Sequence, residues 1–202
     1  MMPDHSVLVI VDVQNDFCPG GSLAVRDGDA IIPVINEQTT YFSRVIATQD
    51  WHPEGHVSFA SSHPGLQPFD ELDANGISQT LWPDHCIAGT AGARLHPKIN
   101  QAAISLILRK GTKQHMDSYS AFFENDHITP TGLHGYLQEL GAKELYFCGL
   151  ATDVCVCYSA MDALQLGYQV YLLADACRGV DAPAGSADRR LQELADAGCR
   201  IL

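Results

Sequence analysis

The chain has few basic residues for its acidic content. Its 202 residues include 12 Lys and Arg against 24 Asp and Glu, so the formal net charge is -12 at pH 7. Nucleic acids and anionic membrane surfaces repel a protein of this charge. We therefore expect neither of them as a partner.

Long hydrophobic runs are also absent. The longest apolar run near the start covers residues 7–11, whereas a membrane-spanning helix needs about 20 apolar residues. No Lys or Arg precedes this run, although a secretory signal begins with a basic segment. The sequence thus predicts neither a membrane anchor nor a secretory signal.

The cysteines lack the spacing of a disulfide framework. The chain has seven of them, an odd number, at irregular intervals. Free thiols of this kind are typical of a reducing compartment, so we expect a cytoplasmic protein. It would be a monomer or a homo-oligomer.

The composition itself is that of a globular protein. Hydrophobic residues make up 46% and charged residues 18% of the chain, which suits a packed core. This length predicts one well-buried domain over residues 1–202. The chain stops within its last predicted strand, and we expect a few further residues in the natural protein.

Short apolar runs alternate with helical patterns through the sequence. The runs are rich in Val, Ile and Leu without polar alternation, which is typical of a parallel sheet buried on both faces. Helical spacing connects them, for example over residues 133–140, where Thr131 is the expected N-cap, and over residues 158–166. The alternation predicts a three-layer α/β/α fold with a doubly wound, mainly parallel six-stranded sheet. The predicted strands are residues 6–11, 44–48, 105–109, 144–148, 169–173 and 199–202.

Residues 51–100 interrupt this alternation. They are rich in proline and histidine and show little periodicity. A structureless stretch of this length inside a compact domain is often functional. We expect it to be a metal-binding loop insertion.

Cys155 stands where a nucleophile would be expected. It follows a predicted strand and comes just before a predicted helix. A thiol in the first turn of a helix faces unpaired backbone N–H groups and the positive end of the helix dipole, which lower its pKa. The alternative is that a small, half-apolar side chain simply packs there.

Three further polar residues come at the ends of predicted strands. Asp12 ends the first, Asp50 follows the second and Lys110 ends the third. Taken singly, Asp12 could cap a turn and Lys110 could be a surface residue. Together with Cys155 they would lie at the carboxyl edge of one sheet, where α/β proteins bind ligands. An acid, a cation and a thiol at one edge predict covalent acyl transfer.

Histidines near Asp50 indicate a metal site. Asp50 and His52 are two residues apart, so in an extended strand their side chains point the same way. With His85, and with His56 nearby, they offer a carboxylate and imidazoles to zinc, iron or manganese. Alternatively, these histidines are only hydrogen-bonded in loops. A ligand at Cys86 would instead make a closed, structural site.

Seven short motifs, in order over nearly the whole chain, carry a family resemblance. They are VDVQNDF at 11–17, GGSLAV at 20–25, TQDWHP at 48–53, WPDHC at 82–86, RKG at 109–111, DSYSAF at 117–122 and GLATDVC at 149–155. On these motifs the chain resembles the nicotinamidases, within the isochorismatase-like cysteine hydrolases, and DSYSAF favours nicotinamidases over their relatives. The resemblance implies the isochorismatase-like hydrolase fold.

The resemblance also implies a role for each matching residue. For His56 two roles stay open: it is either a further metal ligand or a group that supports the ligands from behind. The implied roles are Asp12, Lys110 and Cys155 for catalysis; Asp50, His52 and His85 for one divalent metal ion; Phe17, Trp82 and Tyr119 for the substrate ring; and the N–H groups of Ala151 and Cys155 for an oxyanion hole, with a cis peptide between Leu150 and Ala151.

The implied activity is hydrolysis of nicotinamide to nicotinate and ammonia through a cysteine thioester, in NAD salvage. Pyrazinamide would also be accepted, and the metal would be zinc, with iron or manganese as alternatives. One rival is a related metal-free cysteine amidohydrolase that acts on N-carbamoyl or ureido compounds. Another is a non-catalytic metal or redox protein that uses Cys155 and Cys157 as a thiol pair.

Overall fold

Six strands form one sheet in the order β5-β2-β1-β6-β7-β8, in a computed structural model that describes all 202 residues. Every neighbouring pair in this sheet is parallel. From β1 the chain builds outward to β2 and β5, then returns and builds outward to β6, β7 and β8, which confirms the doubly wound fold. The strands are β1 Ser6–Val11, β2 Val45–Asp50, β5 Leu106–Lys110, β6 Glu144–Leu150, β7 Gln169–Arg178 and β8 Arg200–Ile201.

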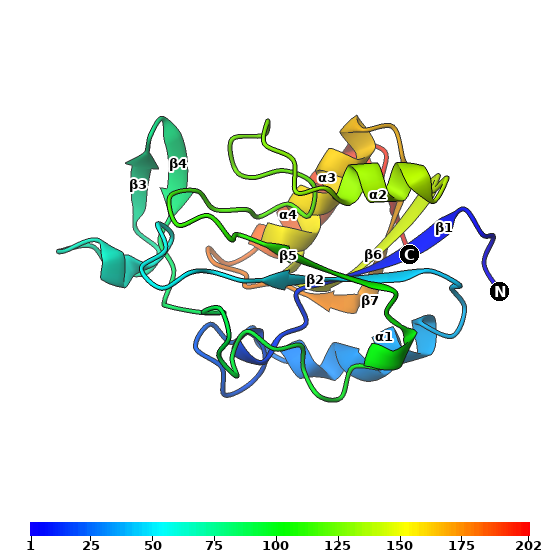
Figure 1. Cartoon of the computed structure of the whole chain (residues 1–202), viewed down its shortest axis with the longest axis horizontal. Helices are drawn as coiled ribbons and strands as arrows, with labels where there is room; N and C mark the ends of the chain where they lie inside the picture. Colours follow the sequence, from blue (N-terminus) through cyan, green and yellow to red (C-terminus); the bar gives the residue numbers. More distant parts are fainter.

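Helices cover both faces of the sheet and complete the three layers (Figure 1). α1 (Ile32–Gln38) lies on one face, and α2 (Leu133–Glu139), α3 (Cys157–Gln165) and α4 (Ser186–Asp196) lie on the other. None of these helices has both the length and the hydrophobicity of a membrane span. Short 3-10 helices cover Asn15–Phe17, Gly28–Ile31, Ala60–Ser62 and Gln101–Ala103, and a π-helical turn covers Thr152–Val156.

Sequence periodicity located the elements but missed some of their ends. β7 runs to Arg178, five residues beyond the predicted strand end. α2 begins at Leu133 with Gly132 at the N-cap position, one residue later than predicted. The Thr131 hydroxyl still accepts from the Leu133 N–H at 3.3 Å, and it donates to the carbonyl of Ala121 at 2.6 Å. The bond to Ala121 ties the start of α2 to the neighbouring loop.

The segment 51–100 is more regular than expected. It contains an antiparallel hairpin of β3 (Glu71–Ala74) and β4 (Ile77–Thr80). Figure 1 shows the hairpin standing apart from the main sheet, beyond the carboxyl ends of its strands. The strands are short and largely polar, so they show little hydrophobic pattern. The available signal was Asn75–Gly76, a pair typical of two-residue hairpin turns, and both residues have positive φ.

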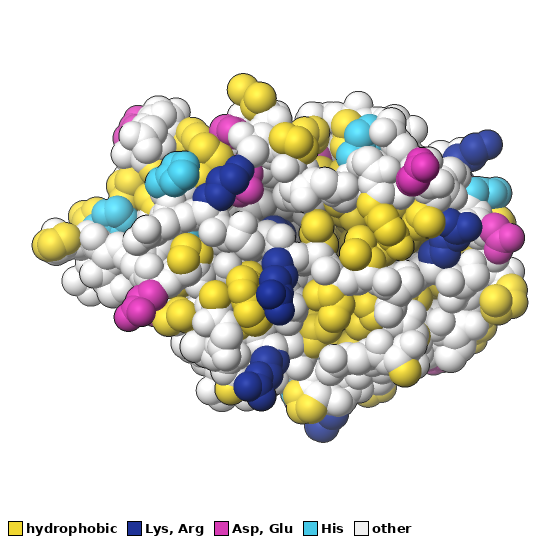
Figure 2. Space-filling view, viewed as in Figure 1, with side chains coloured by type: hydrophobic (Ala, Val, Ile, Leu, Met, Phe, Trp, Pro, Cys, Tyr) yellow, Lys and Arg dark blue, Asp and Glu magenta, His cyan; other side chains and the backbone are white.

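β5 departs from the expectation that the strands are buried on both faces. It is an edge strand with alternating burial, and its second residue, Ile107, is 44% exposed. In Figure 2 hydrophobic side chains gather in the middle of the face where β5 lies. The guanidinium of Arg109 stacks 3.7 Å over the ring of Trp51 and so covers part of this edge.

Candidate active site

Side chains from four strand ends meet at the carboxyl edge of the sheet, as predicted. Asp50 and Lys110 are register partners at the ends of β2 and β5. Asp12 directly follows β1, and Cys155 lies in the π-helical turn after β6. All four residues are buried. The edge thus gathers a thiol, two carboxylates and an ammonium group.

The Lys110 ammonium is the centre of this cluster. Its Nζ lies 2.9 Å from Oδ2 of Asp12 and 3.4 Å from Sγ of Cys155, and it also contacts the Asp50 carboxylate. Nζ also donates a hydrogen bond to the carbonyl of Ser118 at 2.9 Å. Burial alone would lower the pKa of Lys110, but Asp12 and Asp50 raise it well above its usual value. Lys110 is therefore charged.

The Cys155 thiol differs from its sequence-based expectation. Burial raises the pKa of Cys155 well above its usual value, and the carboxylates of Asp50 and Asp12 add to this effect, while Lys110 opposes it. The prediction of a lowered pKa was therefore wrong, because it considered the helix end and not the burial. The thiol keeps its proton at rest, and a base beside it has to take that proton.

Asp12 lies beside the thiol as a candidate base. Burial raises the pKa of its carboxyl group, although Lys110 and the Thr48 hydroxyl favour the charged form. Thr48 donates to Oδ1 at 2.6 Å, which leaves Oδ2 facing Lys110. A carboxylate with a raised pKa is a better proton acceptor than an ordinary one.

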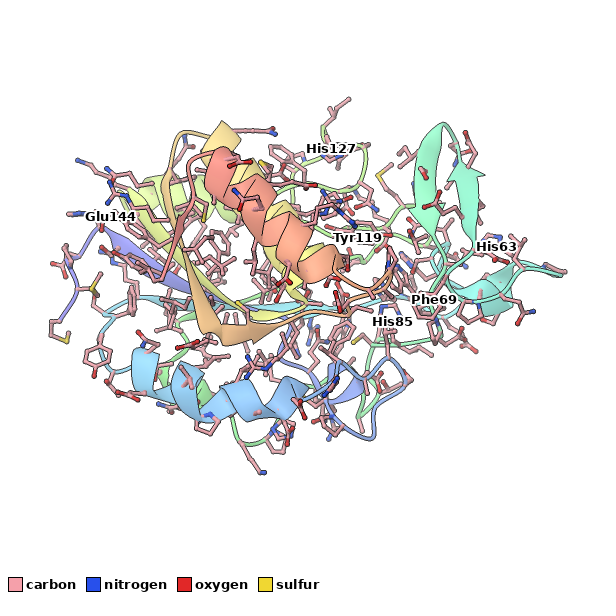
Figure 3. The ribbon with its side chains drawn as sticks, turned by 180° about the vertical axis from the view of Figure 1, so that it is seen from behind. His63, Phe69, His85, Tyr119, His127 and Glu144 are labelled. Carbon is pink, nitrogen blue, oxygen red and sulfur yellow. The ribbon has the colours of Figure 1, made fainter.

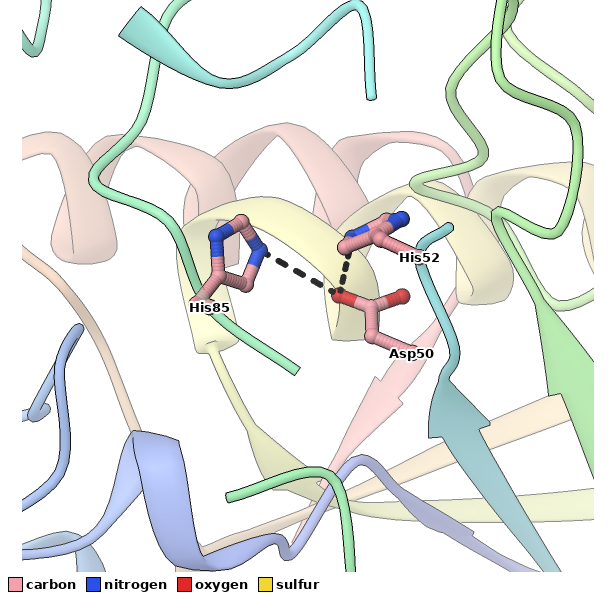
Figure 4. Close-up of side chains that lie close together, drawn as sticks. All are labelled: Asp50, His52 and His85. Carbon is pink, nitrogen blue, oxygen red and sulfur yellow. Dashed lines mark ion pairs between the residues drawn. The ribbon is translucent and has the colours of Figure 1, made fainter. Parts of the chain in front are cut away.

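Asp50, His52 and His85 come together as a candidate metal centre (Figure 4). Oδ2 of Asp50 lies 3.6 Å from Nε2 of His52 and 3.9 Å from Nε2 of His85. Three ligand atoms this close can share one ion. Burial and His52 lower the pKa of His85 to about 4, so its imidazole is neutral and can act as a ligand at neutral pH.

Backbone carbonyls orient both candidate histidine ligands. Nδ1 of His52 lies 2.9 Å from the carbonyl of Gly111, and Nδ1 of His85 lies 2.7 Å from that of Pro83. A carbonyl only accepts hydrogen bonds, so each Nδ1 carries a proton and each Nε2 faces the Asp50 carboxylate, which raises the pKa of His52. Both rings are therefore set to coordinate through Nε2, which fits a divalent ion.

His56 lies behind this cluster. Its ring stacks on that of His52, with centroids 4.2 Å apart. Nδ1 lies 2.7 Å from the Ser58 hydroxyl and Nε2 lies 3.3 Å from the carbonyl of Met116, so both ring nitrogens already have hydrogen-bond partners. These contacts support the His52 ring. His56 also lies with His52 and Asp117 in a group close enough to share an ion, so both roles that its spacing allows stay open.

A pocket opens between the thiol and the histidine cluster. Its cavity volume is about 30 Å³. Aromatic rings form much of its wall, and Figure 3 shows His85 and Tyr119 on the hairpin side of the molecule, where the pocket lies. Trp82 donates from Nε1 to the Tyr119 hydroxyl at 3.3 Å. The predicted residues on the pocket wall are Phe17, Trp82, Tyr119, His85, Asp50 and Cys155.

Ala151 also lines the pocket. The peptide bond between Leu150 and Ala151 is cis, as the family resemblance implied. The Ala151 carbonyl accepts from the N–H groups of Val154 and Val156, both at 3.1 Å, which shapes the turn that carries Cys155. The Ala151 N–H has no acceptor within the protein. It is available to a ligand in the pocket.

Two residues that support the site, Gln14 and Asp117, were not predicted from the sequence. The Gln14 side chain accepts from the Asp50 N–H and donates to the Asp50 carbonyl, both at 2.8 Å, and so fixes the end of β2. Asp117 lines the pocket and accepts from Gln79 at 3.0 Å. The available signal for Gln14 was its position: it is a polar residue two places after Asp12, in a stretch that is buried.

The other cysteines lie away from the pocket. All seven are buried free thiols, and only Cys155 contributes to the pocket wall. Burial raises the pKa of Cys157 to about 11, and its charged neighbours are Arg190 and Glu193 of α4. Cys157 thus faces α4, so it is not paired with Cys155 as a redox couple would be.

The fold and this cluster of buried groups are those of an α/β enzyme of the hydrolase class. The family model of the Isochorismatase domain matches residues 6–202. The chain belongs to the isochorismatase family.

Nicotinamidases and pyrazinamidases are among its relatives. A nicotinamidase of Acinetobacter baylyi is 48% identical over 195 residues, which cover 96% of this chain and 91% of the relative. The structure of a nicotinamidase/pyrazinamidase from Acinetobacter baumanii is 49% identical with a TM-score of 0.97 and covers 100% and 97% of the two chains. A Pyrococcus horikoshii pyrazinamidase, solved in complex with zinc, is 35% identical with a TM-score of 0.80 over 98% of both chains.

Proposed function

We propose that this protein is a nicotinamidase, an amidohydrolase that converts nicotinamide and water to nicotinate and ammonia. The observation that carries the proposal is that Lys110 contacts both Asp12 and Cys155, and that Cys155 lines a pocket with aromatic walls. The identity of 48% with a nicotinamidase over nearly the whole chain supports this substrate. Pyrazinamide, a close ring analogue, is a second substrate, and the reaction belongs to NAD salvage.

In the first half of the reaction Cys155 is the nucleophile and Asp12 is the base. As Sγ attacks the carboxamide carbon, the thiol proton moves to Asp12, and the carbonyl oxygen takes up negative charge. The N–H groups of Ala151 and Cys155 stabilise that oxygen. The carbon–nitrogen bond then breaks, the proton passes from Asp12 to the departing nitrogen, and ammonia leaves a thioester on Cys155.

Water resolves the thioester in the second half. Asp12 takes a proton from the attacking water, and the carbon–sulfur bond breaks to release nicotinate. The proton on Asp12 then returns to the sulfur, which restores the resting thiol. Lys110 keeps its charge throughout and holds Asp12 and Cys155 in register through its contacts of 2.9 Å and 3.4 Å.

Asp50, His52 and His85 would hold one divalent ion. We propose zinc, with iron(II) and manganese as ions that the same ligands accept; the zinc complex of the Pyrococcus horikoshii relative supports this choice. When bound, the ion supplies a Lewis acid for the lone pair of a pyridine nitrogen. Phe17, Trp82 and Tyr119 would pack against the ring and set its plane.

Residues 1–202 form one domain, in which the segment 51–100 supplies His52 and His85 to the metal centre. Seven buried free cysteines support a reducing, cytoplasmic location. The protein acts as a monomer or a homo-oligomer.

A substrate panel tests the activity. We expect the purified protein to release ammonia from nicotinamide and from pyrazinamide, and to leave N-carbamoyl amines and ureido compounds intact. Release from the carbamoyl compounds, without release from nicotinamide, would support the rival amidohydrolase.

A further inference from the structure

A second hollow adjoins the pocket at its mouth. This outer groove has a volume of about 450 Å³ and shares Trp82, Tyr119 and Val154 with the pocket wall. Because these three side chains line both hollows, only they separate a ligand in the pocket from the groove. In Figure 3 Phe69 and Tyr119 lie on the hairpin side of the molecule, near α4.

Aromatic rings form one side of the outer groove. Phe69 is 52% exposed and meets the Trp82 ring edge-on, with centroids 5.8 Å apart. Tyr119 and Tyr158 pack against each other at 5.2 Å. A flat or short aliphatic extension of a substrate ring can pack against such a surface.

Arginines of α4 form the other side. Arg190 lies 5.4 Å over the Tyr158 ring and pairs with Glu193 at 2.7 Å, so its charge is already balanced. Arg189 lines the same groove, is exposed, and has no carboxylate partner in the structure. In a chain with a net charge of -12, an unpaired guanidinium beside the mouth of the pocket is a candidate anion contact.

Two acidic residues also face the groove. Asp153 accepts from the N–H groups of Val180 and Asp181, both at 2.8 Å, and from the Ser186 hydroxyl, so its oxygens are occupied. Glu71, on the hairpin, is exposed and unpaired. The groove therefore presents a free cation on α4 and a free anion on β3.

The orientation of the bound pyridine ring determines which ring substituent points toward the groove, and this orientation rests on the proposed function. A pyridine ring with its nitrogen at Asp50, His52 and His85 and its 3-carboxamide at Cys155 directs carbon 5 away from both. Trp82, Tyr119 and Val154, which line both hollows, stand between the pocket and the part of the groove that α4 lines.

We propose that the outer groove is a subsite for an anionic substituent on carbon 5 of the ring, with Arg189 as the residue that recognises it. The enzyme then hydrolyses aromatic carboxamides that carry a short carboxylate at that position, in addition to nicotinamide. Glu71 works against this binding from the opposite wall.

The test compares 5-(carboxymethyl)nicotinamide with its methyl ester, which has a similar shape and no charge. We expect kcat/KM for the acid to exceed that for the ester in the wild type. Arg189→Gln should reduce this acid-to-ester ratio about two- to fivefold, as for one exposed charge pair, and Glu71→Gln should raise it. Added salt should also reduce the ratio, because it screens exposed charges.

Lys143→Gln is the matched control. It removes one exposed cation at the amino end of β6, away from the groove, and should leave the ratio unchanged. A wild-type ratio of one or less, or a ratio that Arg189→Gln does not alter, overturns the proposal. So does a failure to hydrolyse either substituted compound while nicotinamide is consumed. Inactivity toward nicotinamide itself would contradict the proposed function as well.

Discussion

The ammonium group of Lys110 lies 3.4 Å from the sulfur of Cys155. The same ammonium lies 2.9 Å from Asp12, so one buried cation joins the proposed base and the proposed nucleophile. Burial keeps the proton on the sulfur at rest, and Lys110 stabilises the thiolate only as the proton leaves. A protonated resting thiol also reacts slowly with electrophiles other than the bound substrate.

Serine variants should distinguish the role of Cys155 from that of Cys157. Cys155→Ser should lower kcat by roughly 10³-fold or more, because a hydroxyl is a poorer nucleophile in this setting. Cys157→Ser, on the side of α4, should retain activity close to wild type. Ammonia release measures both variants, and substantial activity in Cys155→Ser would remove Cys155 from the mechanism.

Asp12→Asn should prevent formation of the thioester. An amide has nearly the volume of a carboxylate but does not take up the thiol proton, so no acyl-enzyme should accumulate. Mass spectrometry of the protein, quenched during turnover with nicotinamide, measures the acyl-enzyme. The thermal midpoint of the variant controls for folding, since Lys110 keeps its contact with Asp50. A normal yield of acyl-enzyme from a folded variant would assign the base to another group.

Gly111→Ala should disturb the metal centre through one methyl group. A Cβ at this position would clash with Cε1 of His52, so the imidazole would have to move. We expect bound metal, measured by elemental analysis, to fall at least about tenfold, as for loss of a group that orients a ligand. Gly141→Ala is the control, because its φ of +64° is close to the +62° of Gly111 and its Cβ would meet open space. That variant should lose about 1–2 kcal/mol of stability and keep its metal.

Chelation of the metal should affect substrate binding more than the chemical step. If the ion orients the ring, its removal raises KM, and zinc restores the original value. A sharp fall in kcat at constant KM would contradict this orienting role. His85→Ala should reproduce the effect of chelation, whereas a variant at exposed His115 should behave like the wild type.

Asp162 should make stability depend on pH. Its Oδ2 is buried without a hydrogen-bond partner, and burial raises the pKa of the carboxyl group. The native state then binds a proton more tightly than the unfolded chain, so stability falls as pH rises from about 3.9 through the native pKa. Asp162→Asn should be more stable than the wild type above this window, and the advantage should shrink below it. Thermal unfolding across pH tests this, with exposed Glu139→Gln as a control that shows no such trend.

Much of the site followed from strand ends in the sequence. Asp12, Lys110 and Cys155 could be placed together because parallel strands bring their carboxyl ends to one edge. The raised pKa of Cys155 could not be predicted, since burial depends on side chains packed from the whole chain. The bonds from Gln14 to Asp50 were hidden for the same reason, because they join residues 36 positions apart. The outer groove needs both the hairpin and α4, and the short polar strands of that hairpin left no periodic signal.

Ammonia release from nicotinamide, measured with the metal-loaded wild type and with Cys155→Ser, is the decisive measurement for catalysis by Cys155. We expect equal amounts of ammonia and nicotinate from the wild type, and almost none from the variant. Absence of ammonia from the folded, metal-loaded wild type, or equal release by both proteins, would contradict it.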